Sequence, residues 1–299
     1  MLITPARNEE QNLPEVSRSV TGQKVKPELW VIVDDGSTDE TSRIVENLKT
    51  SYFWIQSIRL PPRPRDITFH YSYVCKQGFD HALDYCRKNK IEFEYIGILD
   101  ADTVLEENYF GKLLEEFEKD ESLGIASGGV YYDIGGKLSR EMTDKNLPRG
   151  TGRLWKKECF VETDGYQVEP SPDSISNIKA LLRGWKIMQY ADVIQIQKRE
   201  TCSANGLWDG YIKKGGMAYY LGKNLLLAFL NVIYYSLKPP FYTGAAYFYG
   251  YLGSAIKREK KISDPEIRAY YRKQGISELY SRISGTFDRK SEDAHKREQ

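Results

Sequence analysis

The stretch YIGILDADTVLEENYF, residues 95–110, places two aspartates directly after an apolar run. The run is typical of a buried strand, and Asp100 and Asp102 follow it with only Ala101 between them. A helix is predicted shortly afterwards, over 108–120. Two carboxylates this close repel each other and are costly to remove from water. The pattern therefore calls for a bound cation, a hydrogen-bonded loop, or both.

Strand-like and helix-like segments alternate around this stretch. Strands are predicted at 1–4, 28–35, 53–60, 95–100, 124–132 and 187–197, a loop-rich passage at 149–166, and helices between most of the strands, such as 77–90 and 174–184. This alternation predicts βαβ units, and hence an α/β fold with a mostly parallel sheet covered by helices on both faces. Ligands of such sheets bind outside the carboxyl ends of the strands, where Asp34, Asp35, Asp100 and Asp102 are expected.

Bulk composition excludes some classes of function. The chain has 299 residues with a formal net charge of +1, so nothing favours nucleic-acid binding, which calls for a clearly basic domain. Four cysteines occur without any C-x-x-C pair, which argues against zinc and against a disulfide framework. The first ten residues contain no apolar segment typical of a signal peptide. We expect a cytoplasmic protein with reduced thiols.

The Asp-x-Asp motif has two interpretations. Mg²⁺ and Mn²⁺ prefer oxygen ligands, commonly one or two carboxylates together with substrate phosphates. A turn after the strand would aim Asp102 at such an ion, while Asp100 meets a ribose hydroxyl or a metal-bound water. In the alternative interpretation Asp102 or Thr103 only caps the following helix.

The stretch VIVDDGSTDET, residues 31–41, is a second acidic motif at a strand end. Asp34 or Asp35 can accept a hydrogen bond from a base N–H or a ribose hydroxyl. The same residues are also typical of a strand–turn–helix corner, in which Ser37 or Thr38 caps a helix with acidic residues in its first turn.

Three stretches, in this order and spacing, resemble the family 2 glycosyltransferases, which have the GT-A fold. They are TPARNEE (4–10), VIVDDGSTDET (31–41) and ILDADTVLEENYF (98–110). The stretch RGTGRLWKKECFVETDGY (149–166) resembles the next segment of the family. The resemblance covers roughly residues 1–200 and implies a Rossmann-like nucleotide-diphospho-sugar transferase domain.

The resemblance also implies an activity and a set of site residues. The activity is metal-dependent, inverting transfer of a sugar from a UDP- or GDP-linked donor to a glycan or lipid-linked acceptor, with Mn²⁺ or Mg²⁺ as cofactor. The implied donor-binding residues are Thr4, Pro5, Ala6, Arg7 and Glu9 around the base and ribose, Asp34 or Asp35 on the base, Lys76 and Gly78 in a donor segment, and Asp100, Ala101 and Asp102. Of these, Asp102 binds the metal and Asp100 lies near the metal and the ribose.

The resemblance places the general base at Asp173, eleven positions before Gly184. Family members commonly carry an acid directly before the base, and often another two positions after it; this chain has Pro172 and Ile175 there. Glu169 is close enough along the chain to be a rival base.

Nitrogen ligands are poorly supported. Where related sequences often have a histidine as a further metal ligand, this chain reads IQIQKRE, so Gln197 is either a substitute or has no role there. The histidines match no motif and are interpreted as structural or surface residues; they are His70, His81 and His295.

The C-terminal third has a different pattern, which predicts a helical extension. Residues 224–237 and 241–256 are apolar and aromatic, and each run is shorter than the roughly 18–20 residues that span a bilayer. They are either two packed helices or a membrane-surface element, whose basic run KREKK (257–261) would meet anionic head groups at the cytoplasmic face.

The expected domain limits follow from these patterns. They are 1–204 for the catalytic domain (donor side 1–135, acceptor side 136–204), 205–285 for the extension, and 286–299 for a disordered tail.

Two other classes of function compete with the transferase. A sugar-phosphate nucleotidyltransferase can share the fold and the Asp-x-Asp motif, but typically has an early glycine-rich basic loop, and TPARNEE has no glycine. A non-catalytic domain that binds nucleotide or glycan is the other alternative. Donor hydrolysis in the presence of Mn²⁺ would distinguish it from an enzyme.

Overall fold

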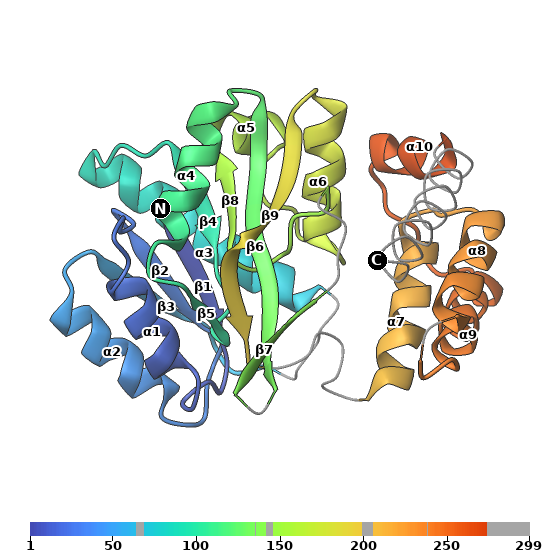
Figure 1. Cartoon of the computed structure of the whole chain (residues 1–299), viewed down its shortest axis with the longest axis horizontal. Coiled ribbons are helices and arrows are strands. Elements are labelled where there is room, and N and C mark those ends of the chain that lie inside the picture. Colours follow the sequence, from blue (N-terminus) through green and yellow to red (C-terminus); the bar gives the residue numbers. More distant parts are fainter. Residues whose placement is uncertain (64–68, 135, 142–145, 199–205, 238, 274–299) are drawn as a thin grey trace, which may run out of the picture. The chain divides into compact units, whose positions relative to one another are not determined.

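The computed structural model describes residues 1–63, 69–134, 136–141, 146–198, 206–237 and 239–273. The chain divides into two compact units, Met1–Glu200 and Thr201–Gln299 (Figure 1). The first contains a sheet with helices and the second is helical. The predicted tail at 286–299 lies outside the described residues, as does Cys202.

One mixed sheet forms the centre of the first unit. Its strands are β1 (Leu2–Ala6), β2 (Trp30–Asp34), β3 (Ile55–Arg59), β4 (Tyr95–Ile98), β5 (Thr103–Leu105), β6 (Leu123–Ile134), β7 (Lys137–Arg140), β8 (Arg153–Lys156) and β9 (Lys186–Gln197). The order is β3-β2-β1-β4-β8-β6-β9-β5, with β7 paired to β6 (Figure 1).

Helices cover both faces of this sheet, as the alternation predicted. They are α1 (Leu13–Thr21), α2 (Thr41–Ser51), α3 (His70–Asn89), α4 (Tyr109–Lys119), α5 (Lys157–Glu162) and α6 (Pro172–Leu182). Successive strand residues point to opposite faces. Leu2 and Trp30 therefore join a core with α1, α2 and α4, whereas Ile3 and Val31 join another with α3, α5 and α6.

The sheet is parallel over β3, β2, β1 and β4, where the βαβ pattern is clearest. Beyond β4 it is mixed, because β8 pairs antiparallel with both β4 and β6. This strand comes from the passage 149–166, which the sequence predicted to be rich in loops, and α5 follows it directly. The prediction was wrong because the strand is short. Its alternation is real: Leu154 and Trp155 enter opposite cores.

Two helix caps considered from the sequence are not observed. The helix after the second acidic motif begins at Thr41 without a side-chain cap or an acidic first turn, because Ser37 and Thr38 bind Asn8 instead. Neither Asp102 nor Thr103 caps a helix, since Thr103 opens β5, which pairs with β9.

Four described helices make up the second unit: α7 (Leu207–Tyr220), α8 (Leu225–Ser236), α9 (Thr243–Ile256) and α10 (Pro265–Lys273). Glycines let α7 and α9 pack with their backbones close together. A Cβ on Gly215 would lie 1.9 Å from the carbonyl oxygen of Tyr247, and one on Gly250 would lie equally close to that of Ile212. Part of the aromatic segment therefore forms a packed core, which agrees with the interpretation of these runs as packed helices.

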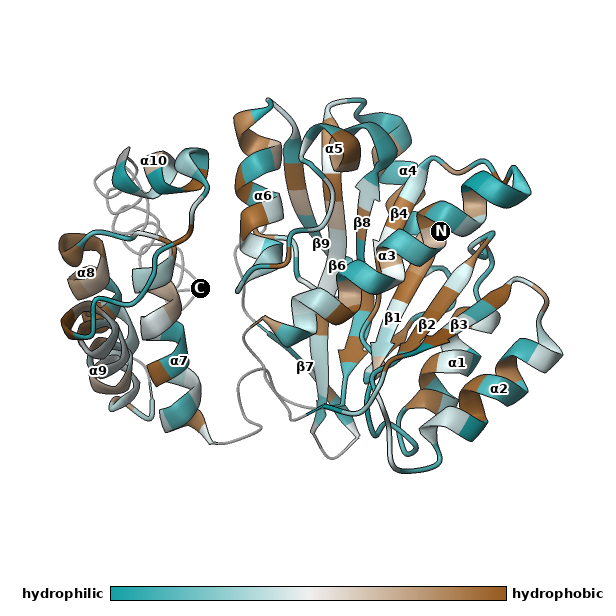
Figure 2. Ribbon diagram, turned by 180° about the vertical axis from the view of Figure 1, so that it is seen from behind, coloured by the Kyte–Doolittle hydropathy of each residue, from teal (hydrophilic) through white to brown (hydrophobic). Residues whose placement is uncertain are grey.

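One face of α8 remains exposed. Leu225, Leu226, Phe229, Ile233 and Leu237 all have more than 40% of their surface accessible, and α8 is drawn mostly in brown shades in Figure 2. Within the described residues, we find no helix with the length and apolar character needed to cross a bilayer.

Candidate active site

The predicted acidic residues gather at one edge of the sheet. Parallel register places Ala6 beside Asp34, and the amide of Asp35 donates to the carbonyl of Ala6 at 2.9 Å. On the other side of β1, the amide of Leu99 donates to the carbonyl of Ile3, so Asp100 follows at the same edge. The carboxyl ends of β1, β2 and β4 thus meet where a ligand of an α/β sheet binds.

The carboxylate of Asp100 lies in a strongly perturbed environment. Burial, and then the neighbouring Asp102, raise its pKa from 3.8 to about 6. Tyr71 on α3 opposes this shift by donating its hydroxyl to Oδ1 at 2.7 Å. The backbone amide of Asp100 donates to Thr151 Oγ1 at 2.9 Å. The repulsion between the two aspartates expected from the sequence is therefore present.

Asp102 lies beside the end of β9. Its carbonyl accepts from the amide of Lys198 at 3.0 Å, and Thr103 pairs with Gln197 across the strands. The amide oxygen of Gln197 is 3.3 Å from the hydroxyl of Tyr132. Gln197 is thus next to the motif in space, and its role toward a metal stays a prediction.

Asp34 organises the turn after β2. Its carboxylate accepts from the amide of Ser37 at 2.9 Å and from the hydroxyl of Ser42, and it lies 3.5 Å from the guanidinium of Arg59. Only 2% of Asp34 is exposed. These contacts hold the turn in place, and a role of Asp34 toward the base stays a prediction.

Asp35 faces two cationic or titratable groups. Arg7 Nη1 is 3.2 Å from Oδ2, and His70 Nε2 is 2.8 Å from Oδ1. His70, which the sequence left as a structural or surface residue, therefore lies against one of the predicted aspartates. It lies in the first turn of α3, which the sequence predicted to begin only at residue 77.

The loop after β1 is fastened to the loop after β2. The amide of Asn8 donates to Ser37 Oγ at 3.1 Å, and the amide of Glu9 donates to Thr41 Oγ1 at 2.7 Å. The carboxylate of Glu9 is close enough to Asp100 to raise its pKa slightly further. Arg7 and Glu9 are therefore the side chains of TPARNEE that approach the aspartates.

A buried cation lies between the motif region and α6. Arg153 is fully buried, and its guanidinium donates to the carbonyls of Pro148, Arg149 and Asp173 at 2.6, 2.7 and 3.2 Å. Burial lowers the pKa of Arg153 to about 10. The guanidinium joins the loop 148–149 to the first turn of α6, where Asp173 lies.

Tyr166 connects Asp173 with the acidic motif. Burial raises its pKa first, and both Asp173 and Asp100 raise it further through their charges. The thiol of Cys75 is in hydrogen-bond contact with the hydroxyls of Tyr71 and Tyr166. Asp100 and Asp173 therefore lie near the same buried tyrosine, although 73 positions separate them in the chain.

A family model described as glycosyl transferase family 2 matches residues 1–170, which is more than half of the chain. This range contains all four predicted aspartates of the sheet edge. The chain belongs to glycosyl transferase family 2. The resemblance in the sequence motifs is thereby confirmed.

Several curated members of this family are similar in sequence. Poly-beta-1,6-N-acetyl-D-glucosamine synthase of Staphylococcus aureus (strain COL) is 22% identical over 221 residues, and the enzyme of that name from Staphylococcus epidermidis is 26% identical over 226 residues. Each match covers 67% of this chain and 50% of the relative. The family 2 chain thus spans about half the length of the curated relatives it matches.

Solved structures show the GT-A fold. S. aureus TarS 1–349 in complex with UDP-GlcNAc matches 93% of this chain and 79% of its own, with a TM-score of 0.53 and 15% identity. Mannosyltransferase PcManGT from Pyrobaculum calidifontis, in complex with GDP-Man and Mn²⁺, matches 96% and 86%, with a TM-score of 0.52 and 15% identity. The predicted α/β GT-A class with C-terminal helices is confirmed.

Several residues predicted to bind the donor of this family 2 domain have buried side chains. The Thr4 hydroxyl accepts from Trp30 Nε1 at 2.9 Å within the core, and Ala6 and Ala101 are buried in the same cluster. Pro5 lies between them on β1 and is half-buried. A donor can therefore reach Thr4, Ala6 and Ala101 through their backbone atoms alone.

The predicted Lys/Gly donor segment lies in the middle of α3. Lys76 forms an ion pair with Asp80 on the helix surface. Gly78 packs against the sheet, where a Cβ would lie 2.7 Å from Val33 Cγ2. Packing therefore explains the glycine in this family 2 chain, and a role of either residue toward the donor stays a prediction.

Sequence reasoning missed His70, Tyr71, Thr151, Arg153 and Tyr166 as members of this family 2 site. None of them belongs to an acidic motif. The RGTG segment was one indication in the sequence, because a glycine-rich stretch is typical of a backbone that lies close to a ligand or to another segment. At Gly152, with φ of 61°, a Cβ would lie 1.9 Å from Gln195 Oε1.

Proposed function

We propose that the chain transfers a sugar from a UDP- or GDP-linked donor to an acceptor hydroxyl with inversion at the anomeric carbon. The proposal rests on one observation in this family 2 chain: Asp100 and Asp102 lie together after β4. Asp35, which contacts Arg7 and His70, lies at the same edge of the sheet. Solved structures of the same fold hold UDP-GlcNAc and GDP-Man, which supports a nucleotide-sugar donor here.

A divalent ion fits the acidic pair. Burial and the charge of Asp102 raise the pKa of Asp100, and a cation beside the pair would favour the ionised carboxylate of Asp100. Among the described residues, no group of three or more side chains of the metal-binding types could hold an ion alone. Mg²⁺ and Mn²⁺ commonly use one or two carboxylates and take the remaining ligands from substrate phosphates and water. When bound, the ion would neutralise charge on the leaving diphosphate.

Asp173 is the proposed general base. It lies in the first turn of α6, and its side chain faces Gly150, where a Cβ would come within 3.6 Å of Asp173 Cβ. The missing side chain at Gly150 leaves room beside the carboxylate. The acceptor hydroxyl is a weak nucleophile, and a carboxylate that removes its proton on the face opposite the leaving group would give inversion. Glu169, in the segment before α6, is the rival.

The acceptor is proposed to be a glycan or a lipid-linked molecule. A lipid-linked acceptor is supported by the exposed apolar face of α8 and by the basic run 257–261, which would bring the chain to the cytoplasmic face of a membrane.

Binding and hydrolysis of the donor test the proposal. Calorimetry with UDP-GlcNAc and GDP-Man should show binding of one donor in Mn²⁺, which weakens by about tenfold or more in EDTA or in the Asp102→Asn variant. Slow release of free sugar would distinguish an enzyme from a binding domain. If Asp102→Asn binds and turns over like the parent, the metal role is wrong.

A further inference from the structure

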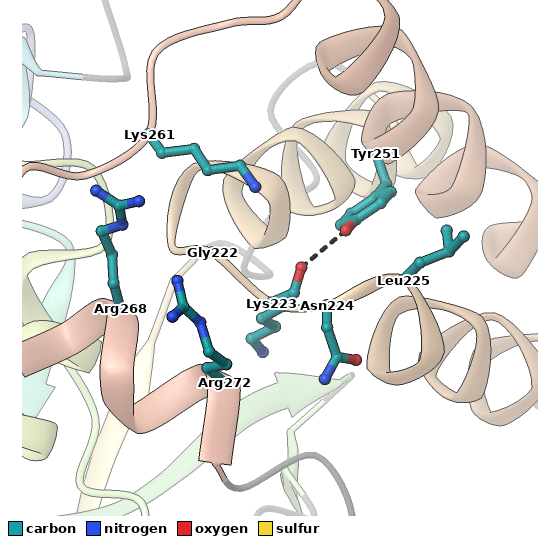
Figure 3. Close-up of a pocket in the computed structure, with 8 residues that line it drawn as sticks. All are labelled: Gly222, Lys223, Asn224, Leu225, Tyr251, Lys261, Arg268 and Arg272. Atoms are coloured by element: carbon teal, nitrogen blue, oxygen red, sulfur yellow. Dashed lines mark hydrogen bonds between the residues drawn. The ribbon is translucent and has the colours of Figure 1, made fainter. Parts of the chain in front are cut away.

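A cavity of about 260 Å³ lies in the helical unit, and residues between 222 and 272 line it (Figure 3). Its lining comes from the α7–α8 link, the first residue of α8, α9, the segment before α10, and α10 itself. The lining residues are Gly222, Lys223, Asn224, Leu225, Tyr251, Lys261, Arg268 and Arg272. Every one of them belongs to the second unit, so the cavity is a feature of that unit alone.

Four of these eight residues are cationic, and none carries a carboxylate. Arg268 and Arg272 are one helical turn apart on α10, and their side chains extend into the same space as Lys261 in Figure 3. Neither arginine forms an ion pair within the described part of the chain. Like charges gathered in one cavity repel each other, so this arrangement favours a bound anion.

Aromatic rings hold the two lysines. The ammonium of Lys261 lies 4.5 Å from the ring centroid of Tyr219, and that of Lys223 lies 5.1 Å from the ring centroid of Tyr271. An ammonium over a ring keeps its positive charge. The lysines are therefore placed by packing and do not simply extend into solvent.

The backbone of the cavity is fixed as well. Tyr251 donates its hydroxyl to the carbonyl of Lys223 at 2.7 Å, and Gly222, with φ of 82°, leaves space beside Arg268. Asn224 caps α8 by accepting from the amide of Leu227 at 2.8 Å. The N-terminus of α8, with its positive partial charge, begins at the cavity wall.

Acidic residues near α10 in the sequence do not line the cavity. The carboxylate of Asp264 accepts from the amides of Glu266 and Ile267 at 2.9 and 3.3 Å, so it serves the start of α10. The amide of Ile262 donates to the carbonyl of Tyr220 at 2.9 Å, and Ile267 is fully buried, which fastens α10 to the rest of the unit. The two arginines are thus presented from an anchored helix.

We propose that this cavity binds a phosphate or pyrophosphate group. One guanidinium group can donate two parallel hydrogen bonds to two oxygens of a phosphate. Two arginines with two lysines can also neutralise a doubly or triply charged group. The volume is smaller than the 300–1,000 Å³ typical of sites for whole drug-sized ligands, so it suits a charged head more than a complete nucleotide. The inference goes beyond the proposed sugar transfer and does not depend on it.

The phosphate has two possible sources, a soluble anion or a lipid head group. Leu225, which lines the cavity, and its neighbour Leu226 lie in the first turn of α8, and both are more than half exposed. A ligand with a hydrocarbon tail would cover them, whereas a soluble anion would not.

Calorimetry on the intact chain tests the site, with inorganic pyrophosphate as the probe and EDTA present so that no metal contributes. The variant is Arg268→Gln/Arg272→Gln, and the matched control is Lys257→Gln/Lys260→Gln, which removes the same charge from positions of the same unit that do not line the cavity. We expect pyrophosphate affinity to fall about tenfold or more in the variant and less than about twofold in the control. An equal loss in both, or no binding to the parent, overturns the proposal.

Vesicles distinguish the two sources. If the ligand is a lipid head group, phosphatidic acid in phosphatidylcholine vesicles should sediment the parent, and pyrophosphate should release part of it. The arginine variant should lose that pyrophosphate-sensitive part and keep the part due to α8 and residues 257–261. Pyrophosphate binding without arginine-dependent sedimentation assigns the site to a soluble anion. Unchanged circular dichroism and melting temperature show that both variants are folded. Vesicle binding that ignores the arginines, in a chain that also fails to bind pyrophosphate, contradicts the site.

Discussion

At the scale of single residues, the raised pKa of Asp100 makes the stability of the folded protein depend on pH. The Asp100 carboxyl titrates near 3.8 when unfolded and near 6 in the folded chain, because of burial and Asp102. Between these values only the folded state holds the proton, so protonation favours folding at low pH and this advantage is lost as the pH rises through about 6. Above pH 6 the ionised carboxylate destabilises the protein until a cation arrives.

Replacing Asp100 by Asn should therefore stabilise the metal-free protein. The shift corresponds to at most about 3 kcal/mol, and we expect about half of it because the side chain is partly accessible to water. In EDTA at pH 7.5 the melting temperature should rise by several degrees, at about 2–4 °C per kcal/mol, and the gain should shrink as the pH is lowered toward 4. A lower melting temperature at pH 7.5 would show that Asp100 is stabilised by its neighbours.

The general base can be assigned by a matched pair of substitutions. Asp173→Asn should reduce transfer by about 10² or more, while donor affinity in Mn²⁺ stays the same. The hydrogen bond from Arg153 to the backbone carbonyl of Asp173 is kept in this variant, and the charge of the carboxylate, which favours the buried guanidinium, is removed. Glu169→Gln is the control and should retain activity. The reverse pattern would give the role to Glu169.

At the scale of elements, α3 carries both the core and the site. His70 and Tyr71 in its first turn contact Asp35 and Asp100, and one turn later Cys75 joins Tyr71 and Tyr166. Gly78 then lets the helix approach the sheet closely. The position of the helix against the sheet thus determines where the site side chains lie.

Gly78→Ala tests this packing. The added Cβ would lie 2.7 Å from Val33 Cγ2 and 3.4 Å from Ile3 Cδ1, both in the core, so we expect a loss of about 1–3 kcal/mol in the free energy of unfolding. Gly253→Ala on α9 is the control, since nothing lies within 4 Å of its Cβ, and it should be neutral or stabilise by up to about 1 kcal/mol. Urea unfolding measures both. Equal effects would mean that the contact with Val33 is relieved by repacking.

At the scale of the whole molecule, the acidic sheet edge belongs to one unit and the apolar and basic surfaces to the other. The exposed face of α8 is a row of large apolar side chains, which in a soluble protein usually marks an interaction site. A membrane surface suits both this row and the basic run 257–261.

Sedimentation with vesicles tests membrane contact of the intact chain. Leu226→Ser/Phe229→Ser/Ile233→Ser should reduce binding to anionic vesicles several-fold, because buried apolar area drives such binding. Phe53→Ser is the control, since Phe53 is 92% exposed on the first unit. Added salt should release part of the parent protein, as basic contacts weaken with screening. No sedimentation with any lipid would remove the support for a lipid-linked acceptor.

Much of the fold and the acidic part of the site could be predicted from the residues alone. Apolar runs with intervening helices are local patterns, and a carboxylate after a buried strand in such a chain has to lie at the carboxyl edge of the sheet. Asp34, Asp35, Asp100 and Asp102 were placed correctly on this edge for that reason. The family motifs carried the same information.

Tertiary structure alone decided the rest, because long-range contacts leave no periodic trace in the chain. The antiparallel pairing of β8 with β4, the contact of His70 with Asp35, and the hydrogen bond from Arg153 to the carbonyl of Asp173 each join segments separated in the sequence. The basic cavity of the helical unit is of the same kind, since its cations span residues 223–272. The sequence does not show whether a charged side chain is solvated or lines a cavity, because the packing of distant segments determines its neighbours.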